Sequence, residues 1–174
     1  SAAVTVNELI GPFFTWRALH RSGEVGKDRR RLIQFLQEEY IITGLRARDR
    51  WDALEKVTDF FVRTHHVPDW QRAELYQSIR EREAEYSTSI GKGAAIPHGR
   101  IQKGAGIRGV MAILHHGVDF EAYDGEPVRI IMLVVTPKGY DNEHLEVMAS
   151  LAQMIRHEGI RERLRLLWTD AMAL

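Results

Sequence analysis

A histidine lies between a proline and a glycine in the middle of the chain, where it could act as a nucleophile. The segment is Pro97-His98-Gly99, at the end of a run of small residues too rich in glycine for a helix. Proline fixes φ just before the histidine, and glycine lets another molecule approach the backbone closely. We therefore expect His98 to be presented for access rather than for packing. Its unperturbed pKa of about 6.5 leaves a large neutral, nucleophilic fraction near pH 7.

Two further residues could serve a phosphoryl group at His98. Phosphoryl transfer needs an aligned acceptor and groups that balance the charge on the phosphoryl oxygens. Arg82 lies near the end of the helix expected before this segment, and His144 lies where a helix begins just after an apolar strand. Helix N-termini beyond strand ends are common anion sites in α/β sheets. Each residue also has a purely structural interpretation: Arg82 could pair with Glu81 or Glu85, and His144 could cap its helix.

The pattern of apolar residues predicts the strands that would position these groups. Strands are expected over residues 40–43, 109–114 and 128–135. The last of these is nearly all apolar, which is typical of a central strand covered on both faces. The chain is thus predicted to be a mixed α/β domain.

Apolar residues three or four apart predict helices over residues 47–63 and 68–83. After the central strand, Asn142 is the expected N-cap of a further helix, and Gly159 is its expected end. Residues 160–167 are expected to form a short closing helix. These elements would cover the sheet.

Composition excludes several classes of function. The 174 residues carry 24 basic and 24 acidic side chains, which argues against a dedicated nucleic-acid-binding protein. Because the chain has no cysteine, it cannot form disulfides, thiolate metal sites or a cysteine nucleophile. No apolar run approaches the roughly 18 residues of a membrane span. The pairs His65-His66 and His115-His116 are expected to diverge, so we predict neither a metal site nor a cofactor.

The segment around His98 resembles the active-site signature of the type-2 IIA domains (mannitol, fructose and nitrogen class) of the bacterial phosphoenolpyruvate-dependent phosphotransferase system. In that family a Gly-x-Ala-[Ile/Val]-Pro-His segment carries the histidine that accepts a phosphoryl group, and here it matches residues 93–98. Ala94 departs from the larger residue usual in the family. Further matches extend the resemblance over about residues 40–174: Arg82-Glu83, Thr88 and Glu143-His144-Leu145.

This resemblance implies a three-layer α/β/α sandwich with a mixed central sheet, and it implies roles for individual residues. His98 would accept the phosphoryl group, His144 would hydrogen-bond that group or steer the acceptor ring, and Arg82 would neutralise charge. The phosphoryl group would also contact the hydroxyl of Thr88 and approach the backbone at Gly99. The implied donor is a phosphohistidine carrier protein.

Residues 1–39 are expected to form an extension or linker ahead of a IIA-like domain over residues 40–174. The piece from Val6 to Glu24 resembles the end of the last membrane helix and the exit segment of bacterial cation/proton antiporters. A basic cluster follows at residues 27–31, as is typical of a cytoplasmic flank. We therefore expect a cytoplasmic domain that is tethered to the inner membrane through an upstream transporter region.

Three functions remain open at this point. The first is regulation of an attached or partner transporter by phosphorylation of His98, which would make the domain a phosphotransferase. The second is a sugar-specific IIA component that passes the group to a IIB domain. The third is an interaction module that cannot be phosphorylated, and the presence of His98, His144 and Arg82 together argues against it. The antiporter-like segment favours regulation, while the sequence leaves the oligomeric state and the reacting nitrogen of His98 open.

Overall fold

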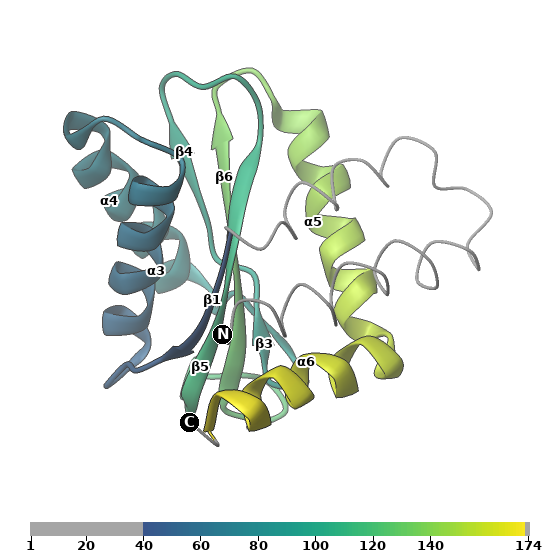
Figure 1. The fold of residues 1–174 in the computed structure, drawn as a ribbon. Coiled ribbons are helices and arrows are strands. Elements are labelled where there is room, and N and C mark those ends of the chain that lie inside the picture. The colour runs from purple at the N-terminus through teal and green to yellow at the C-terminus, as the bar shows by residue number, and fades with distance from the viewer. Residues whose placement is uncertain (1–39, 173–174) are drawn as a thin grey trace.

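A mixed β-sheet forms the middle layer of the protein, and helices cover both of its faces (Figure 1). The computed structural model describes residues 40–172, so the predictions for residues 1–39 lie outside the described part. The strands are β1 Ile41–Leu45, β2 Ser89–Gly91, β3 Ala94–Ala95, β4 His98–Ile101, β5 Arg108–Val118 and β6 Val128–Pro137. The helices are α3 Arg50–Thr64, α4 Asp69–Glu85, α5 Asp141–Arg156 and α6 Glu158–Met172. The predicted three-layer α/β/α architecture is confirmed.

The central strand β6 organises the sheet. The strand order is β1-β5-β6-β3-β2, and β4 continues beyond β3 along the same side of β6. β5 runs antiparallel to β6, whereas β3 and β4 run parallel to it and β1 runs parallel to β5. Because β4 ends beside the end of β6, with Ile101 opposite Pro137, the loops that follow both strands lie at one end of the sheet.

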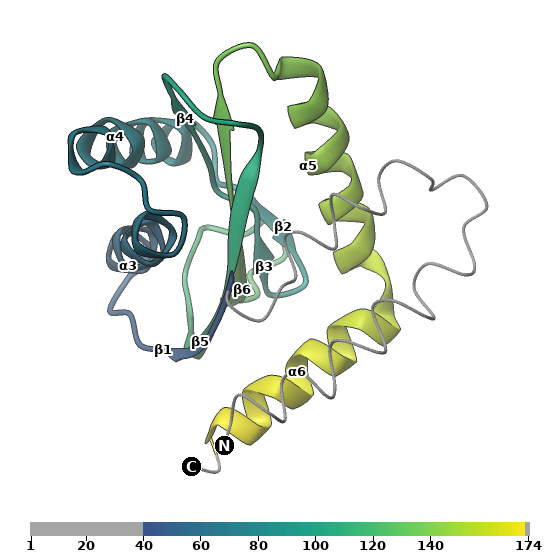
Figure 2. The ribbon, with the colours of Figure 1, turned by 45° about the horizontal axis from the view of Figure 1, so that its top comes forward.

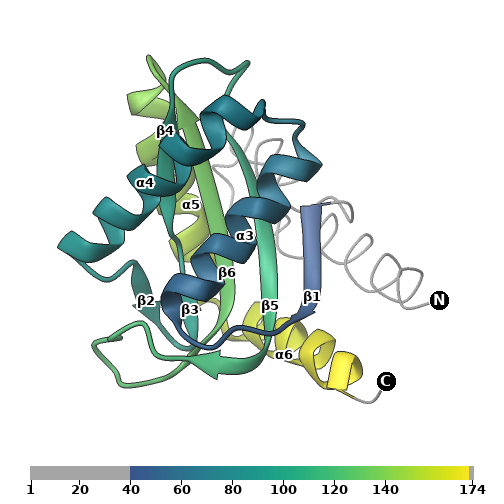
Figure 3. The ribbon, with the colours of Figure 1, turned by 90° about the vertical axis from the view of Figure 1, so that its left-hand side faces the viewer.

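Two apolar clusters hold the three layers together. On one face α3 and α4 pack Phe61 and Leu75 against Ile131 of β6. On the other face α5 and α6 pack Leu151 and Leu164 against residues that include Met132 and Val134 (Figures 2 and 3). Successive residues of β6 alternate between the two clusters, which explains why the strand is apolar along most of its length. No helix within residues 40–172 has the length and apolarity needed to cross a membrane.

Three predicted helix boundaries were wrong. Asn142 lies inside α5, because Tyr140 occupies the N-cap position and makes no side-chain cap bond. Gly159 does not end α5: that helix ends at Arg156, with His157 as its C-cap, and Gly159 is the second residue of α6. Helix α6 then continues beyond the predicted end at residue 167.

The glycine-rich run before His98 forms short strands and no helix, and the prediction that it is too rich in glycine for a helix is confirmed. Gly91, Lys92 and Gly93 all have positive φ, at 75°, 59° and 72°, and make the tight connection between β2 and β3. This conformation is costly for residues with a side chain and easy for glycine. His98 is the first residue of β4, so it is anchored to the sheet opposite Val134.

Candidate functional site

Three elements bring His98, Arg82 and His144 together at one end of the sheet. His98 begins β4, Arg82 lies in the last turn of α4, and His144 lies in the first turn of α5. The ring centroids of the two histidines are 5.2 Å apart, with an angle of 56° between the rings. Nε of Arg82 lies 3.2 Å from Nε2 of His98. The three residues expected to act together therefore do lie together.

The backbone around Pro97 fixes the ring of His98. Because Ile96 precedes a proline, it is restricted to extended conformations. Its N–H donates to the carbonyl of Thr88, and the carbonyl of Pro97 accepts from the N–H of Val134. The carbonyl of Ile96 lies 3.1 Å from Nδ1 of His98. The Ile-Pro-His sequence thus orients the ring as well as exposing it.

These contacts decide which nitrogen of His98 is nucleophilic. A carbonyl oxygen only accepts hydrogen bonds, so Nδ1 carries the ring hydrogen. Arg82 Nε–H only donates, which agrees with a lone pair on Nε2. Burial lowers the pKa of His98 below its usual value. The hydrogen bond to the Ile96 carbonyl opposes this in part, and the charges of Arg82 and Arg100 add smaller effects that lower the pKa. The ring is therefore neutral at pH 7, with Nε2 as the nucleophile.

Arg82 has a buried hydrogen-bond donor that lacks an acceptor. Its Nη1 is buried and has no hydrogen-bond partner within residues 40–172. Its guanidinium carbon lies 5.9 Å from the centroid of the exposed Tyr86 ring. A buried guanidinium N–H without an acceptor is unusual, because its desolvation is not repaid. The oxygens of a phosphoryl group bonded through phosphorus to Nε2 of His98 would supply acceptors to this group.

His144 is held neutral beneath the site. Gly139, with φ of 89°, makes the turn from β6 into α5, and His144 N–H donates to the Tyr140 carbonyl in the first helical turn. The side chain is 8% exposed, and its Nδ1 lies 2.9 Å from Oγ1 of Thr136. Burial lowers the pKa of His144 to about 4, and His98 contributes in the same direction. The ring can therefore act on a phosphoryl group only as a neutral donor or acceptor.

Sequence reasoning missed two residues beside this site. Arg100 lies two positions after His98 in β4, and its Nη1 pairs with Oδ1 of Asp141 at 2.7 Å. Its charge lowers the pKa of both histidines. Alternation along a strand could have indicated that it shares a face with His98. Thr136 could have been noticed as a polar residue at the end of an apolar strand.

Thr88 and Gly99 each have a structural partner in this arrangement. The hydroxyl and the N–H of Thr88 both donate to the carboxylate of Glu83, whose pKa is raised mainly by burial. The only hydroxyl hydrogen of Thr88 is thus directed away from a phosphoryl group. A Cβ on Gly99 would lie 2.6 Å from Cγ1 of Ile79, so this glycine allows α4 to pack against β4. Their phosphate-binding roles stay predictions.

The paired histidines lie elsewhere. The rings of His115 and His116 lie edge to face, with centroids 4.2 Å apart, so the prediction that they diverge was wrong. The pairing of β5 with β6 is irregular in this part of the strand, which breaks the simple alternation. Within residues 40–172 no group of three or more potential ligands could hold a metal ion.

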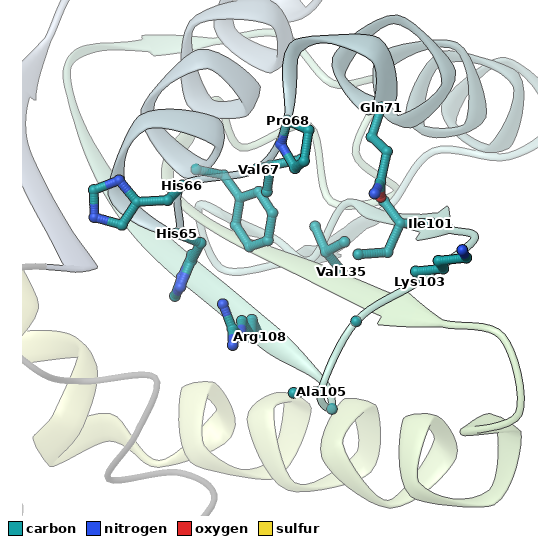
Figure 4. A pocket seen from close by; sticks show the side chains of 13 residues that line it. His65, His66, Val67, Pro68, Gln71, Ile101, Lys103, Ala105, Arg108 and Val135 are labelled. Atoms are coloured by element: carbon teal, nitrogen blue, oxygen red, sulfur yellow. The ribbon is translucent and has the colours of Figure 1, made fainter.

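A cavity of about 120 Å³ lies between the end of α3, the start of α4 and the segment after β4. Figure 4 shows Gln71, His65 and Arg108 around it. His98, His144 and Arg82 do not line this cavity, so it is separate from the candidate site. His65 itself contacts the Gly109 carbonyl through Nε2 at 3.0 Å, which gives this histidine a structural partner.

Comparison with known proteins agrees with this geometry. The chain is 30% identical over 134 residues to a nitrogen regulatory protein of Bradyrhizobium diazoefficiens, a match that covers 77% of this chain and 86% of that protein. It is 30% identical over 112 residues to a PTS system fructose-specific EIIA component of Haloferax volcanii, covering 64% of this chain and 71% of that protein. The crystal structure of the nitrogen regulatory protein IIA-Ntr from Neisseria meningitidis superimposes with a TM-score of 0.66 at 29% identity, covering 72% of this chain and 84% of that one.

The family model described as "Phosphoenolpyruvate-dependent sugar phosphotransferase system, EIIA 2" matches residues 34–170. That span contains both histidines, Arg82 and every strand of the described sheet. The chain therefore belongs to the type-2 EIIA family of the phosphoenolpyruvate-dependent phosphotransferase system.

Proposed function

We propose that Nε2 of His98 accepts a phosphoryl group from a phosphohistidine carrier protein. The observation that carries this proposal is the contact of Nδ1 with the Ile96 carbonyl, which places the ring hydrogen on Nδ1 and the in-plane lone pair on Nε2. In the transfer this lone pair forms a bond to phosphorus, and the bond from phosphorus to the carrier's nitrogen breaks with its electron pair staying on the carrier. His98 keeps its Nδ1 hydrogen, so the positive charge that develops on its ring lies against the Ile96 carbonyl.

The charges around His98 suit this reaction. Arg82 offers the unpartnered Nη1, and a guanidinium binds phosphoryl oxygens well because its donors form a planar fork. Arg100 supplies a second cation nearby, which forms an ion pair with Asp141 in the unphosphorylated protein. The positive charge keeps the unphosphorylated ring neutral and offsets the negative charge that the phosphoryl group brings.

Two exposed apolar side chains mark a surface on which the carrier protein could dock. Tyr86 is 74% exposed beside Arg82, and Leu145 is 68% exposed next to His144 in α5. Each lies beside a residue of the candidate site, so a partner that reaches His98 would come close to both. In this proposal the carrier covers both residues while its phosphohistidine meets His98.

The proposed role of the phosphorylated domain is regulation of a transporter, with transfer to a IIB domain as the alternative. The nitrogen regulatory relatives support a regulatory role in general, and the fructose-specific EIIA relative supports the alternative. We further propose that the domain works at the cytoplasmic face of the inner membrane, tethered through a cation/proton antiporter. That part rests on the resemblance of residues 6–24 alone.

The test is the intact mass of the chain after incubation with phosphoenolpyruvate, enzyme I and the histidine carrier protein. We expect a gain of one acid-labile phosphoryl group that is lost in His98→Ala. The matched control is His157→Ala, which removes an exposed histidine at the end of α5 and should keep the gain. A wild-type chain that gains no mass with active carrier would refute the proposal and favour the interaction module that is never phosphorylated.

A further inference from the structure

Thr136 is a buried polar residue in an otherwise apolar stretch of β6, directly beneath the candidate site. Its side chain is fully buried, and its Oγ1 lies 2.9 Å from Nδ1 of His144. Residues 130–135, which precede it, are all apolar. Burying a hydroxyl costs about 1–3 kcal/mol unless a hydrogen bond compensates it. Within the described part of the chain, His144 is the partner that provides this compensation.

The direction of this hydrogen bond decides what His144 presents to His98. A hydroxyl and a neutral imidazole nitrogen can each donate or accept. If the hydroxyl of Thr136 donates to Nδ1, the ring hydrogen of His144 is on Nε2. If Nδ1 donates instead, Nε2 is a bare lone pair. Nε2 makes no hydrogen bond to any residue in the described range 40–172, so it is the nitrogen left for a ligand.

A phosphoryl group on His98 distinguishes the two directions. Its oxygens are negatively charged acceptors, and the two histidine rings are close enough to share it, with centroids 5.2 Å apart. A bare lone pair on Nε2 of His144 would repel these oxygens, whereas an Nε2–H would donate a charge-assisted hydrogen bond. The ring of His144 does not become cationic near neutral pH, because burial lowers its pKa to about 4.

We propose that Thr136 is a positioning residue whose hydroxyl donates to Nδ1 and so holds His144 in the Nε2–H tautomer that faces the phosphoryl group on His98. The purpose of this tautomer rests on the proposed function, but the tautomer itself is a property of the unphosphorylated protein. In functional histidines, the hydrogen bond that one ring nitrogen makes commonly determines which of the two nitrogens carries the ring hydrogen. Here β6 supplies the partner, and α5 supplies the histidine.

The tautomer can be read directly. In the 174-residue chain labelled with ¹⁵N-histidine, the nitrogen chemical shifts and ring couplings of His144 separate a protonated nitrogen from a bare one. We expect a bare Nδ1 and a protonated Nε2 in the wild type and in Thr136→Ser. A protonated Nδ1 in the wild type would overturn the proposal without any phosphorylation experiment.

The rate of phosphoryl gain from the carrier protein provides the second measurement. Thr136→Val should slow the gain about tenfold, because the hydrogen bond of His144 to the charged group is weakened. Thr136→Ser, which keeps the hydroxyl, should stay near the wild-type rate. The matched control is Thr58→Val: Thr58 is also buried, but its hydroxyl donates to the Leu54 carbonyl on the opposite face of the sheet.

The two measurements separate this inference from the proposed function. Equal rates for Thr136→Val and Thr58→Val would refute the role of Thr136 in transfer while leaving phosphorylation of His98 intact. No phosphoryl gain in the wild type would refute the proposed function, and the tautomer of His144 would still decide whether Thr136 acts as we infer. Should Thr136→Val fail to fold, the wild type and Thr136→Ser still give the tautomer.

Discussion

Replacing His144 by glutamine should reduce the loss of stability that the protein suffers in acid. The pKa of His144 is lowered from 6.5 to about 4, first by burial and then by the charges of His98 and Arg100. Protonation of His144 in the folded protein is therefore unfavourable, whereas the same histidine in the unfolded chain protonates near pH 6.5. Glutamine keeps a polar side chain of similar reach but does not titrate.

The sign and size of the contribution of His144 to the free energy of unfolding follow from this difference in pKa. Since the unfolded chain binds more protons between the two values, stability is fully present above about pH 6.5 and is lost as the pH falls towards 4. Between pH 7 and pH 5 the contribution of His144 falls by about 2 kcal/mol. His98 acts with the same sign, because its pKa is also lowered, whereas Glu83 acts in the opposite direction, because its pKa is raised. Both are present in wild type and variant, so they cancel to first order in the comparison.

Urea unfolding at pH 7 and at pH 5 provides the measurement. The free energy of unfolding of the wild type should fall by about 2 kcal/mol more than that of His144→Gln over this interval. His157→Gln, at an exposed position, should behave like the wild type. Equal losses in the wild type and in His144→Gln would show that the ring of His144 is not held neutral by its surroundings, and the reasoning about its tautomer would lose its support.

Two other substitutions probe the packing and the charge of the site. Gly99→Ala should lower the free energy of unfolding by about 1–3 kcal/mol, because its Cβ would lie 2.6 Å from Cγ1 of Ile79 and 2.9 Å from Cδ1 of Leu75. Urea unfolding checks this, with Gly159→Ala as the control, because a Cβ at that position would meet only ordinary contacts at 3.5 Å. An unchanged free energy of unfolding for Gly99→Ala would contradict the contact. Arg82→Gln should slow phosphoryl gain from the carrier about 10- to 100-fold through loss of a charged donor. Quenched-flow mass measurement tests this, and a wild-type rate would exclude Arg82 from the reaction.

Much of the fold could be predicted because long elements carry their own signal. The apolar strand that became β6 and the periodic helices that became α3 and α4 were expected within a few residues of their bounds. The short strands β2, β3 and β4 could not be, because two to four residues show no period and their pairing with distant β6 defines them. The N-cap predicted at Asn142 was wrong because the turn at Gly139 lets α5 begin at Asp141, one residue before Asn142.

The site residues that belong to a sequence motif were predicted. The residues that join the site only through the packing of distant segments were missed. His98, Arg82 and His144 matched a known pattern and lie together. Thr136 and Arg100 carry no motif, and their relevance comes from the register of β4 against β6, which places them opposite each other. Thr88 was predicted from its motif position to contact phosphate, and this stays a prediction. Nothing in the sequence indicated the partner that its hydroxyl has in the structure, the buried carboxylate of Glu83.

The hydrogen bond from Arg82 to Nε2 of His98 has a consequence for selectivity. An imidazole nitrogen has one lone pair in the ring plane, and in the resting protein Arg82 occupies it. The hydrogen bond between Arg82 and His98 must therefore break before Nε2 can attack phosphorus. Breaking a hydrogen bond of a charged donor costs about 1.5–3 kcal/mol. A partner that brings three phosphoryl oxygens to Arg82 offsets this cost at the moment of transfer. A small phosphodonor that does not reach Arg82 lacks this compensation, so we expect Arg82 to slow transfer from such a donor to His98.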